Sequence, residues 1–233
     1  MKKICPFCKN ENIDFEPFGF EFEILSKLKV VGGGKRDNAR CPICFSMDRE
    51  RLVYLYLKNF TNIFTDSLSV LHVAPEKRLR DKIRTNEKLN YITADLQKKF
   101  VDMNFNLCNI PFENNTFDII ICNHVLEHII DDKKAMKEIF RILKPFGIAI
   151  LQVPFSNLLE KTYEDNTIVS KEQRELHFGQ NDHVRIYGKD YPNKLTKIGF
   201  EVEKFIWQEH QQLINEDYSL LMDEPIFIAK RNK

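Results

Sequence analysis

A short, isoleucine-rich run from Phe117 to Cys122 is followed at once by polar and titratable residues. The run is preceded by a turn-forming stretch at 113–116, and its composition is typical of a strand buried on both faces of a parallel sheet. The polar residues that come directly after it are Asn123, His124, Glu127 and His128. Because ligands of open parallel sheets bind just past the carboxyl ends of the strands, these four residues are a first hypothesis for a site.

The segments on either side of this run alternate between strand-like and helix-like patterns. They predict strands at 69–74, 91–94, 103–107, 117–122, 147–153, 200–207 and 225–230, and helices at 76–86, 132–143 and 189–198. Proline and glycine within 144–147 cannot continue the second of these helices. Alternation of this kind predicts a doubly wound α/β fold with a mostly parallel, seven-stranded sheet between layers of helices.

Two C-x-x-C pairs near the beginning of the chain predict a metal site. The four cysteines are Cys5, Cys8, Cys41 and Cys44. Four thiolates aimed at one point suit the closed tetrahedral coordination of a structural zinc ion. Alternating apolar residues over 18–24 and a glycine turn at 32–34 predict a small ribbon that depends on this metal. The alternative is a redox or regulatory thiol site, and zinc is favoured because all four ligand positions are filled.

A helix predicted at 46–60 joins the ribbon to the main domain, with Ser46 as its N-cap. Arg49 and Arg51 on this helix could reach an anionic ligand, although solvated charges on a helix are commoner. The predicted division is a zinc-ribbon module at 1–46, a linking helix at 47–66 and a main domain at 67–233.

Composition limits the class of protein. With 233 residues, 43% hydrophobic and 30% charged, the chain has the balance of an ordinary soluble globular protein. A net charge of +1 gives no overall electrostatic case for binding nucleic acid or a membrane surface. The first residues lack the apolar core of a signal peptide, and no run approaches the ~18 apolar residues of a membrane span. Paired cysteines that suit metal indicate a reducing compartment, and we expect a cytoplasmic protein.

Asp95 follows the predicted strand at 91–94 and lies about 20 residues past the end of the first strand. An acidic residue at this distance commonly accepts hydrogen bonds from the ribose hydroxyls of a bound nucleoside. A helix-capping aspartate explains the same position equally well, so both roles stay open.

Four blocks of sequence carry a family resemblance. They are VLHVAPE at 70–76, ITADL at 92–96, NIPFENNTFDIIICNHVLEHI at 109–129 and RILKPFGIAILQVP at 141–154. Together they resemble class I S-adenosylmethionine-dependent methyltransferases over about residues 69–230. With the C-x-x-C pairs and FGQNDHVRIYG at 178–188, the resemblance narrows to bacterial zinc-ribbon methyltransferases associated with surface-polysaccharide modification. It implies a Rossmann-like class I methyltransferase fold and S-adenosyl-L-methionine as the cofactor.

The resemblance also implies contacts to the nucleoside end of that cofactor. Asp95 would hold the ribose hydroxyls, and Leu96 lies beside it in the same block. Asn106 falls where the family often has an aspartate that accepts from the adenine amino group, and an amide oxygen can do the same. Leu107 would offer its main-chain N–H to the adenine ring.

By the same resemblance, the first loop and the end of the fourth strand would contact the methionine end of the cofactor. The family's first loop is rich in glycine, whereas the matching positions in this chain are His72, Ala74, Pro75 and Glu76. Glu76 would pair with the cofactor's ammonium group. Asn123 and His124 would line the methionine end and the transferred methyl group.

Methyl transfer to an oxygen benefits from a general base, and histidine is the usual choice. His183 lies in the insertion after the fifth strand, where this family builds acceptor pockets. In an extended segment Arg185 would share the face of His183 and could anchor an anion, while Asp182 would point elsewhere. We predict His183 and Arg185 as the catalytic pair; the alternative for His183 is a loop histidine that caps or packs.

The remaining histidines have less specific roles. His128 would share the face of His124 if a helix began at Asn123, and packing or capping is its commoner role. A metal site made of Cys122, His124 and His128 is conceivable but not favoured, because Cys122 ends a buried strand. Other residues that could contact an acceptor are Tyr163 and His177.

Three functions remain open. The first is methylation of an oxygen, or less readily a nitrogen, on a sugar, a nucleotide-linked sugar or a phosphorylated capsule precursor, such as an intermediate of methyl phosphoramidate assembly. The second is an RNA methyltransferase with a zinc ribbon, which the modest basic charge of residues 1–59 does not favour. The third is a non-catalytic zinc-containing scaffold, motivated by the missing loop glycines. The acceptor and the oligomeric state do not follow from the sequence.

Overall fold

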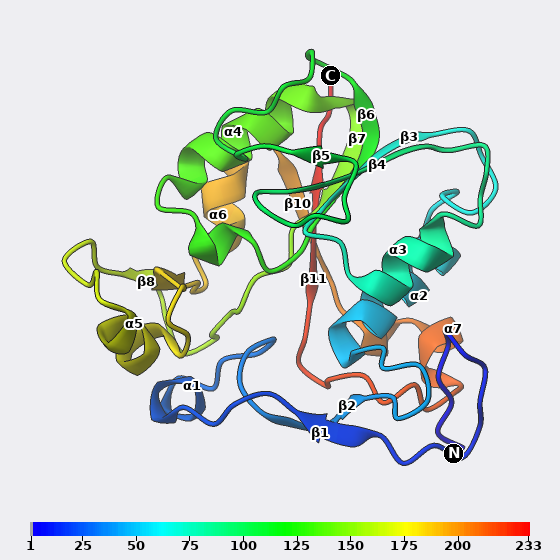
Figure 1. Ribbon diagram of the computed structural model, residues 1–233, viewed down its shortest axis with the longest axis horizontal. Helices are drawn as coiled ribbons and strands as arrows, with labels where there is room; N and C mark the ends of the chain where they lie inside the picture. Colours follow the sequence, from blue (N-terminus) through cyan, green and yellow to red (C-terminus); the bar gives the residue numbers. More distant parts are fainter. Residues whose placement is uncertain (1) are drawn as a thin grey trace.

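The computed structural model describes residues 2–233 and is built around a seven-stranded, mostly parallel sheet (Figure 1). The strands are β3 (Ser69–Val73), β4 (Asn90–Asp95), β5 (Met103–Asn104), β6 (Phe117–Cys122), β7 (Leu143–Ile150), β10 (Glu201–Phe205) and β11 (Ile226–Lys230). Their order across the sheet is β10-β11-β7-β6-β3-β4-β5. Only β11 breaks the parallel pattern, since it runs antiparallel to both β7 and β10. The predicted doubly wound α/β fold is confirmed.

Strand β6 lies in the middle of this sheet and is buried on both faces. Ile120 and Cys122 belong to one hydrophobic cluster, whereas Ile119 and Ile121 belong to another. Alternate side chains of a strand point to opposite faces of the sheet, so two separate cores meet at this one strand. The isoleucine-rich composition of the run is the consequence of that double burial.

Helices cover both faces of the sheet (Figure 1). α4 (Asp132–Ile142) and α6 (Tyr191–Thr196) contribute to the cluster of Ile120, while α2 (Asp48–Phe60) and α3 (Lys77–Ile83) contribute to that of Ile119. α4 begins where the Asp131 carboxylate accepts a hydrogen bond from the backbone N–H of Lys134. Within residues 2–233 no helix is both long and apolar enough to cross a membrane.

The N-terminal segment differs from its predicted form. β1 (Glu16–Phe18) pairs antiparallel with β2 (Arg36–Arg40), but the predicted strand over 18–24 ends at Phe18. Gly19 has a φ of +109°, which turns the chain away, and the short helix α1 (Glu23–Lys27) follows. The buried residue of α1 is Leu25, which packs with Phe178. The alternating aromatic pattern was therefore wrong as a strand signal.

Ser46 does not cap the linking helix. Helix α2 begins at Asp48 after Met47, and the hydroxyl of Ser46 instead lies 3.4 Å from Sγ of Cys5 and 3.2 Å from Sγ of Cys44. The backbone N–H of Met47 donates to the Glu50 carboxylate at 3.2 Å, which satisfies the start of the helix. The predicted helix is confirmed, but its predicted cap was wrong.

Arg51 joins three parts of the chain. Its side chain is fully buried and all five of its N–H groups donate to main-chain carbonyls. These carbonyls belong to Asn38, Ala39, Ser46, Tyr218 and Ser219. Arg51 is thus a structural clamp between the ribbon, the linking helix and the segment before β11.

An insertion follows β7 and carries β8 (Tyr163–Glu164), α5 (Lys171–Phe178) and β9 (Arg185–Ile186). Helices α1 and α5 lie side by side at the edge of the molecule (Figure 1). Val31 also exchanges two backbone hydrogen bonds with Phe155, at 2.8 and 3.0 Å. The N-terminal segment therefore docks onto the insertion, next to the carboxyl ends of the central strands.

Candidate functional site

The carboxyl ends of β3, β4 and β6 meet at one edge of the sheet, where ligands of this architecture bind. The first loop begins with Ala74, whose φ is +48° and whose N–H donates to the carbonyl of Ala94 at 2.7 Å. Pro75 then leads into Glu76, the N-cap residue of α3. A non-glycine residue with positive φ is uncommon and costs free energy, so this tight turn replaces the glycine-rich loop at the price of local strain.

Glu76 is held by two side chains, one from β3 and one from the residue directly after β6. His72, which is fully buried on β3, places Nε2 at 2.8 Å from Oε2 of Glu76 and Nδ1 at 2.8 Å from the hydroxyl of Tyr91. Asn123 donates from Nδ2 to the other carboxylate oxygen at 3.4 Å. Burial raises the pKa of Glu76, but the hydrogen bond and charge of His72 outweigh it and leave the pKa below its usual value. Glu76 is therefore a carboxylate at neutral pH. The side chain of His72 is fully buried, and its contact with the first loop is the hydrogen bond to Glu76.

Asp95 ends β4, and no helix begins directly after it, so it is not a helix cap. Its Oδ1 accepts from the backbone N–H groups of Gln97 and Lys98 at 3.0 and 3.1 Å, which closes a turn after the strand. Its Oδ2 has a looser ion pair with Nζ of Lys98 at 3.4 Å. Burial raises the pKa of Asp95, but these N–H groups and the Lys98 charge lower it overall. Leu96 beside it is 61% exposed, an apolar surface next to an ionised carboxylate.

The loop after β5 carries the two residues predicted at the adenine ring. Asn106 is exposed, and its Oδ1 accepts from the backbone N–H of Cys108 at 2.8 Å. That hydrogen bond closes an Asx turn and occupies one lone pair of the amide oxygen. Leu107 is buried in the core cluster that also contains Ala94. The turn thus fixes where the main chain of this loop lies.

No helix begins at Asn123, contrary to one expectation above. His124 has a φ of +53°, and a 3₁₀ turn, η1 (Leu126–His128), follows before α4. The backbone N–H of His124 donates to the carbonyl of Gln152 at 2.8 Å, which ties the loop to the end of β7. This turned backbone directs His124, Glu127 and His128 towards one region.

Glu127 lies at the centre of a group of histidines. Its Oε1 is 3.6 Å from Nδ1 of His124 and 4.0 Å from Nε2 of both His128 and His183. Burial raises the pKa of Glu127 to about 8 and lowers the pKa of His183 to about 3, while the pKa of His124 falls well below its usual value. Such shifts in a group of neighbouring side chains are typical of functional sites.

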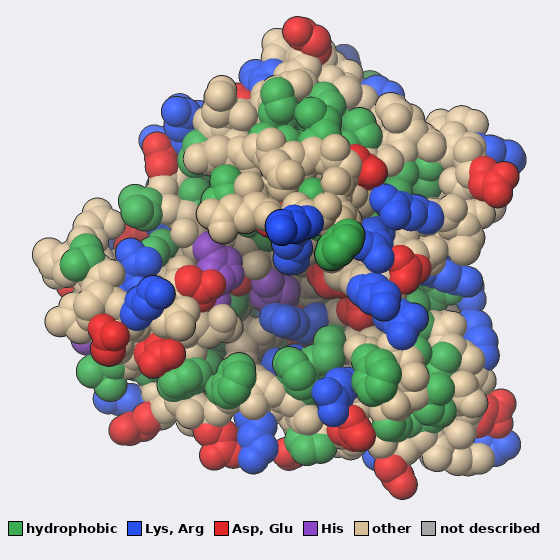
Figure 2. Space-filling model, viewed as in Figure 1, with side chains coloured by type: hydrophobic (Ala, Val, Ile, Leu, Met, Phe, Trp, Pro, Cys, Tyr) green, Lys and Arg blue, Asp and Glu red, His purple; other side chains and the backbone are tan. Residues whose placement is uncertain are grey.

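Buried polar atoms without partners concentrate around this group. Among residues 2–233, ten buried side-chain nitrogen and oxygen atoms have no hydrogen-bond partner, and eight of them belong to six residues near Glu127. These residues are Asn123, His124, Glu127, Gln152, His183 and Glu224. Because unpaired buried polar groups cost free energy, their concentration indicates a place where a ligand supplies the missing partners. Figure 2 shows histidine side chains inside a hollow near the middle of the molecular face.

Arg185 lies beside this hollow but is engaged elsewhere. It is 3% exposed, and its side chain donates to the carbonyls of Leu126, Ile129 and Ile130 and to the Glu164 carboxylate. Four of its five N–H groups are used in this way. The structure therefore places Arg185 behind the η1 turn, where it holds the loop that carries Glu127 and His128. It does not place the guanidinium beside His183 in the hollow.

Asp182 lies next to His128, whereas Tyr163 and His177, which were also predicted as acceptor contacts, pair with each other in the insertion. Asp182 lies in a turn rather than in an extended segment, and its Oδ2 is 3.3 Å from Nδ1 of His128. Tyr163 and His177 are hydrogen bonded to one another at 2.7 Å, between β8 and α5. Asp182 thus joins the histidine group, contrary to the expectation that it would point elsewhere.

Gly32 and Glu224, which the sequence did not assign to the site, border it together with Arg49, for which the sequence suggested an anionic ligand. A Cβ on Gly32 would lie 3.1 Å from Cε1 of His124 and 3.2 Å from Oε1 of Glu224. Arg49 donates from Nη1 to the carbonyl of Gly32 at 2.8 Å. Glu224 comes from the segment before β11, and burial raises its pKa to about 8. The glycine turn was a detectable signal, whereas nothing in the sequence around Glu224 singled it out.

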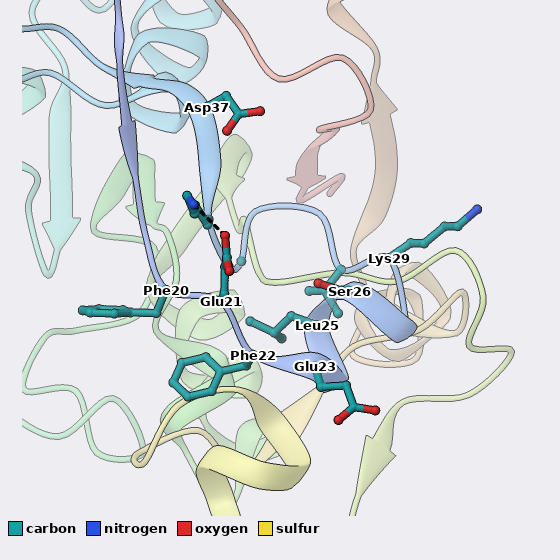
Figure 3. A pocket seen from close by; sticks show the side chains of 12 residues that line it. Phe20, Glu21, Phe22, Glu23, Leu25, Ser26, Lys29 and Asp37 are labelled. Atoms are coloured by element: carbon teal, nitrogen blue, oxygen red, sulfur yellow. Dashed lines mark hydrogen bonds and ion pairs between the residues drawn. The ribbon is translucent and has the colours of Figure 1, made fainter.

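Two hollows flank the Gly32–Gly34 turn. A groove of about 230 Å³ is lined by the turn together with Arg36, Arg49, Gly179 and Gln180. On the other side of α1 a wider hollow of about 610 Å³ is bordered by Phe20, Phe22, Leu25 and Lys29, with an ion pair between Lys35 and Glu21 (Figure 3). The groove is the hollow nearer to the histidine group, because Arg49 lines it and donates a hydrogen bond to Gly32, which packs close to His124.

The four cysteines come together as predicted. Sγ of Cys5 lies 3.5 Å from Sγ of Cys44, Sγ of Cys8 lies 3.9 Å from Sγ of Cys41, and all four lie within 4.8 Å of one another. All four are free thiols. Four sulfurs at these separations fit around one tetrahedral ion with Zn–S bonds of about 2.3 Å.

The order of the seven strands, with β11 antiparallel to its neighbours, is that of the Rossmann-like class I methyltransferase fold, and the predicted fold is confirmed. Residues 59–151 match the family model described as a methyltransferase domain. This match supports the predicted methyltransferase over that part of the chain.

Curated relatives align with the same part of the chain. The uncharacterized protein MJ0638 of Methanocaldococcus jannaschii is 41% identical over 68 residues, which is 28% of this chain and 30% of that protein. The ubiquinone/menaquinone biosynthesis C-methyltransferase UbiE of Idiomarina loihiensis is 32% identical over 91 residues, which is 36% of this chain and 32% of that protein. The chain thus matches less than a third of the length of either relative.

A solved structure supports the fold over a larger share of the chain. The S-adenosylmethionine-dependent methyltransferase of Archaeoglobus fulgidus superposes with a TM-score of 0.51 at 12% identity, covering 78% of this chain and 94% of the other. At this identity the similarity supports the fold and not the acceptor.

Proposed function

We propose that this protein transfers a methyl group from S-adenosylmethionine to an oxygen, or less readily a nitrogen, of a small anionic or sugar-nucleotide acceptor. One observation carries the proposal. The carboxylate of Glu76 is suited to the cofactor's ammonium group and is hydrogen bonded to Asn123. The next residue, His124, belongs to the group of buried side chains whose polar atoms have no hydrogen-bond partner. Cofactor and acceptor sites would then be adjacent, as methyl transfer requires.

The cofactor would supply an activated methyl group on a cationic sulfur, and this chain's residues would bind and orient it. Glu76 would pair with the ammonium group, and Asp95 would accept from the ribose hydroxyls with the oxygen that only Lys98 now approaches. Leu96 would cover one face of the adenine ring, and Leu107 would offer its main-chain N–H. The unpartnered Oδ1 of Asn123 is available to the same ligand.

The acceptor would enter between the glycine turn and the insertion. Arg49 lines this groove, with Nη1 bound to the Gly32 carbonyl. The rest of the guanidinium would bind a phosphate or another anionic group of the acceptor. Arg185 does not enter the proposal as an anion anchor, because it is buried and hydrogen bonded behind the η1 turn.

His183 would receive the hydrogen bond of the acceptor hydroxyl. Burial lowers the pKa of His183 to about 3, so its ring is neutral at pH 7 and can accept that bond. A base this weak contributes mainly by orienting the hydroxyl, with in-line geometry supplying most of the rate.

We further propose that the four cysteines hold a structural zinc ion, that residues 1–46 form a zinc ribbon and that 47–66 link it to a methyltransferase domain at 67–233. The separations of the four sulfurs support the metal. A capsule or surface-polysaccharide role rests on the resemblance of the sequence, and it selects the acceptors worth testing first.

The test has two stages on the full-length chain. Calorimetry with S-adenosylhomocysteine comes first: micromolar binding supports the proposal, and no binding at millimolar ligand favours the scaffold. Nucleotide-linked sugars, sugar phosphates and phosphorylated capsule precursors are then incubated with the cofactor, and products are examined by mass spectrometry and NMR. Transfer to oxygen supports the proposal. Transfer to carbon would instead match the UbiE relative, and a steeply salt-dependent RNA affinity would favour the RNA enzyme.

A further inference from the structure

The turn at 126–128 and the turn at 182–183 bring three metal-ligating side chains together outside the cysteine cluster. Glu127, His128 and His183 each offer one ligand atom, and these atoms all lie within 4.8 Å of one another. The distances from Oε1 of Glu127 to Nε2 of His128 and of His183 are both 4.0 Å. The two imidazole rings lie edge to face with centroids 4.6 Å apart.

These separations are close to those of a metal site. Bonds of about 2.0–2.2 Å place the ligand atoms of a tetrahedral ion roughly 3.4 Å apart. Small side-chain rotations of Glu127 and His128 would close the difference of about 0.6 Å between Oε1 of Glu127 and each of the two imidazole nitrogens. The site is not an ordinary hydrogen-bonded cluster, because at 4.0 Å neither imidazole is hydrogen bonded to Glu127.

The surroundings of the cluster are those of a liganding site. Glu127 and His183 are buried, with 1% and 3% exposure, yet Oε2 of Glu127 and Nδ1 of His183 have no partner among the described residues. His128 is one-third exposed, which leaves a path for an ion from solvent. A buried carboxylate and imidazole that lack partners are costly unless a ligand satisfies them.

Asp182 adds a second feature of metal sites. Its carboxylate lies 3.3 Å from Nδ1 of His128, on the ring edge opposite the nitrogen that faces Glu127. Histidines that bind metals commonly donate their other N–H to a carboxylate, which fixes the tautomer and aims the free nitrogen at the ion. Burial raises the pKa of Glu127, and the carboxylate of Asp182 raises it further. Arg49 and Arg185 are close enough to lower the pKa of Glu127.

We propose that Glu127, His128 and His183 bind a divalent first-row transition-metal ion, with Asp182 orienting His128. Two imidazoles and one carboxylate favour zinc, iron(II), cobalt(II) or manganese(II) over magnesium or calcium. Three protein ligands leave a coordination position open for water or for an oxygen of the acceptor. This last role rests on the proposed methyl transfer, and in the metal-bound protein it replaces the hydrogen bond from the acceptor hydroxyl to His183, because the ion then occupies the lone pair of that imidazole. Metal binding itself does not depend on methyl transfer.

Cobalt(II) is the probe, added to the full-length protein after dialysis against a weak chelator. A cobalt ion among cysteines gives thiolate charge-transfer bands, whereas one bound by histidine and carboxylate gives only weak visible bands. We expect one cobalt ion per chain of the second kind. Glu127→Gln and His183→Ala are each expected to weaken its affinity at least about 100-fold, and Asp182→Asn about 10-fold.

His177→Ala removes a histidine that pairs with Tyr163 outside the cluster and is the matched control, expected to bind cobalt as the wild type does. The proposal is overturned if the wild type binds no cobalt beyond the cysteine cluster, or if the Glu127 and His183 variants bind it with unchanged affinity. Should those variants fail to fold, pulsed electron paramagnetic resonance of the manganese-loaded wild type decides, since two imidazole nitrogen couplings are required. No cofactor or acceptor is present, so this result is independent of methyl transfer.

Discussion

His124 leaves no room for a side chain at Gly32, in a different part of the chain: a Cβ on Gly32 would lie 3.1 Å from Cε1 of His124, closer than an ordinary van der Waals contact. Gly32 belongs to the turn between α1 and β2, and His124 follows the central strand β6. The N-terminal module is therefore a wall of the candidate acceptor site. Removing it would open the hollow that contains the unpaired polar atoms.

Replacement of Gly32 by alanine tests this contact. Gly32 has a φ of +76°, and its new Cβ would also lie 3.2 Å from Oε1 of Glu224. We expect a loss of about 1–3 kcal/mol in the free energy of unfolding, measured by denaturant titration. Gly33→Ala is the control, because its Cβ would meet only side chains, at 3.3 Å or more, and its effect should stay below about 1 kcal/mol. Equal losses in both variants would contradict the close packing of Gly32 on His124.

Asp95 should contribute to cofactor affinity rather than to folding alone. Asp95→Ala removes the carboxylate proposed to bind the ribose, and a charge-assisted hydrogen bond is worth about 1.5–3 kcal/mol. We expect S-adenosylhomocysteine to bind about 10- to 100-fold more weakly in calorimetry. Asp81→Asn on α3, whose carboxylate pairs with Arg80 at the surface, should leave the affinity unchanged. Unaltered binding by Asp95→Ala would restrict Asp95 to closing the turn after β4.

Loss of one cysteine should release the zinc ion. Cys41→Ser leaves three sulfur ligands in a site whose coordination depends on four, and structural zinc contributes directly to folding. We expect the bound zinc, measured by a chromogenic chelator, to fall and the melting temperature to drop. Cys108→Ser, at a thiol outside the cluster, should retain both. A wild-type protein purified without zinc and equally stable would refute the structural role.

The Arg51 clamp should be among the most costly side chains to remove. Arg51→Met preserves much of the volume but leaves five carbonyls without a donor. Unsatisfied buried groups and a lost hydrogen-bond network predict a destabilisation of about 3–5 kcal/mol in urea unfolding. Lys58→Met, at an exposed position of the same helix, should change stability by no more than about 0.5 kcal/mol.

Glu50 should make stability depend on pH. Burial raises the pKa of Glu50 from 4.5 to about 7, so the folded chain holds a proton that the unfolded chain releases. This carboxyl's contribution is complete below about pH 4.5 and is lost as pH rises through about 7, a change of up to about 3 kcal/mol. Unfolding measured from pH 4 to 8 should therefore show a weaker decline for Glu50→Gln than for the wild type. The exposed Glu113→Gln is the control, and identical profiles for all three proteins would exclude the effect.

Local patterns were sufficient for the central sheet because burial acts on each strand separately. Phe117–Cys122 was predicted with its observed bounds, since both faces of that strand are covered. The strand after α4 begins at Leu143 and not at 147, because the chain passes from helix to strand without a loop. The prediction of a strand from the aromatic alternation after Phe18 was wrong, because Gly19 turns the backbone before any residue beyond Phe18 can join the two pairs of the β1–β2 ladder.

The candidate site was predictable only in part because its residues come from distant segments. Asn123, His124 and the four cysteines could be selected from neighbouring residues in the sequence. The grouping of Glu127, His128 and His183 depends on two turns that meet only in the folded chain. Glu224 and Gly32 reach His124 from near opposite ends of the chain, and Arg185 has the expected charge but turns it towards backbone carbonyls.

Arg51 also implies an order of assembly. Two of its five hydrogen-bond acceptors, the carbonyls of Tyr218 and Ser219, lie 167 and 168 residues further along the chain. During synthesis the guanidinium therefore stays hydrated until residues 218 and 219 have left the ribosome. We expect the segment that contains Asn38 and Ala39 to dock onto helix α2 only after that point.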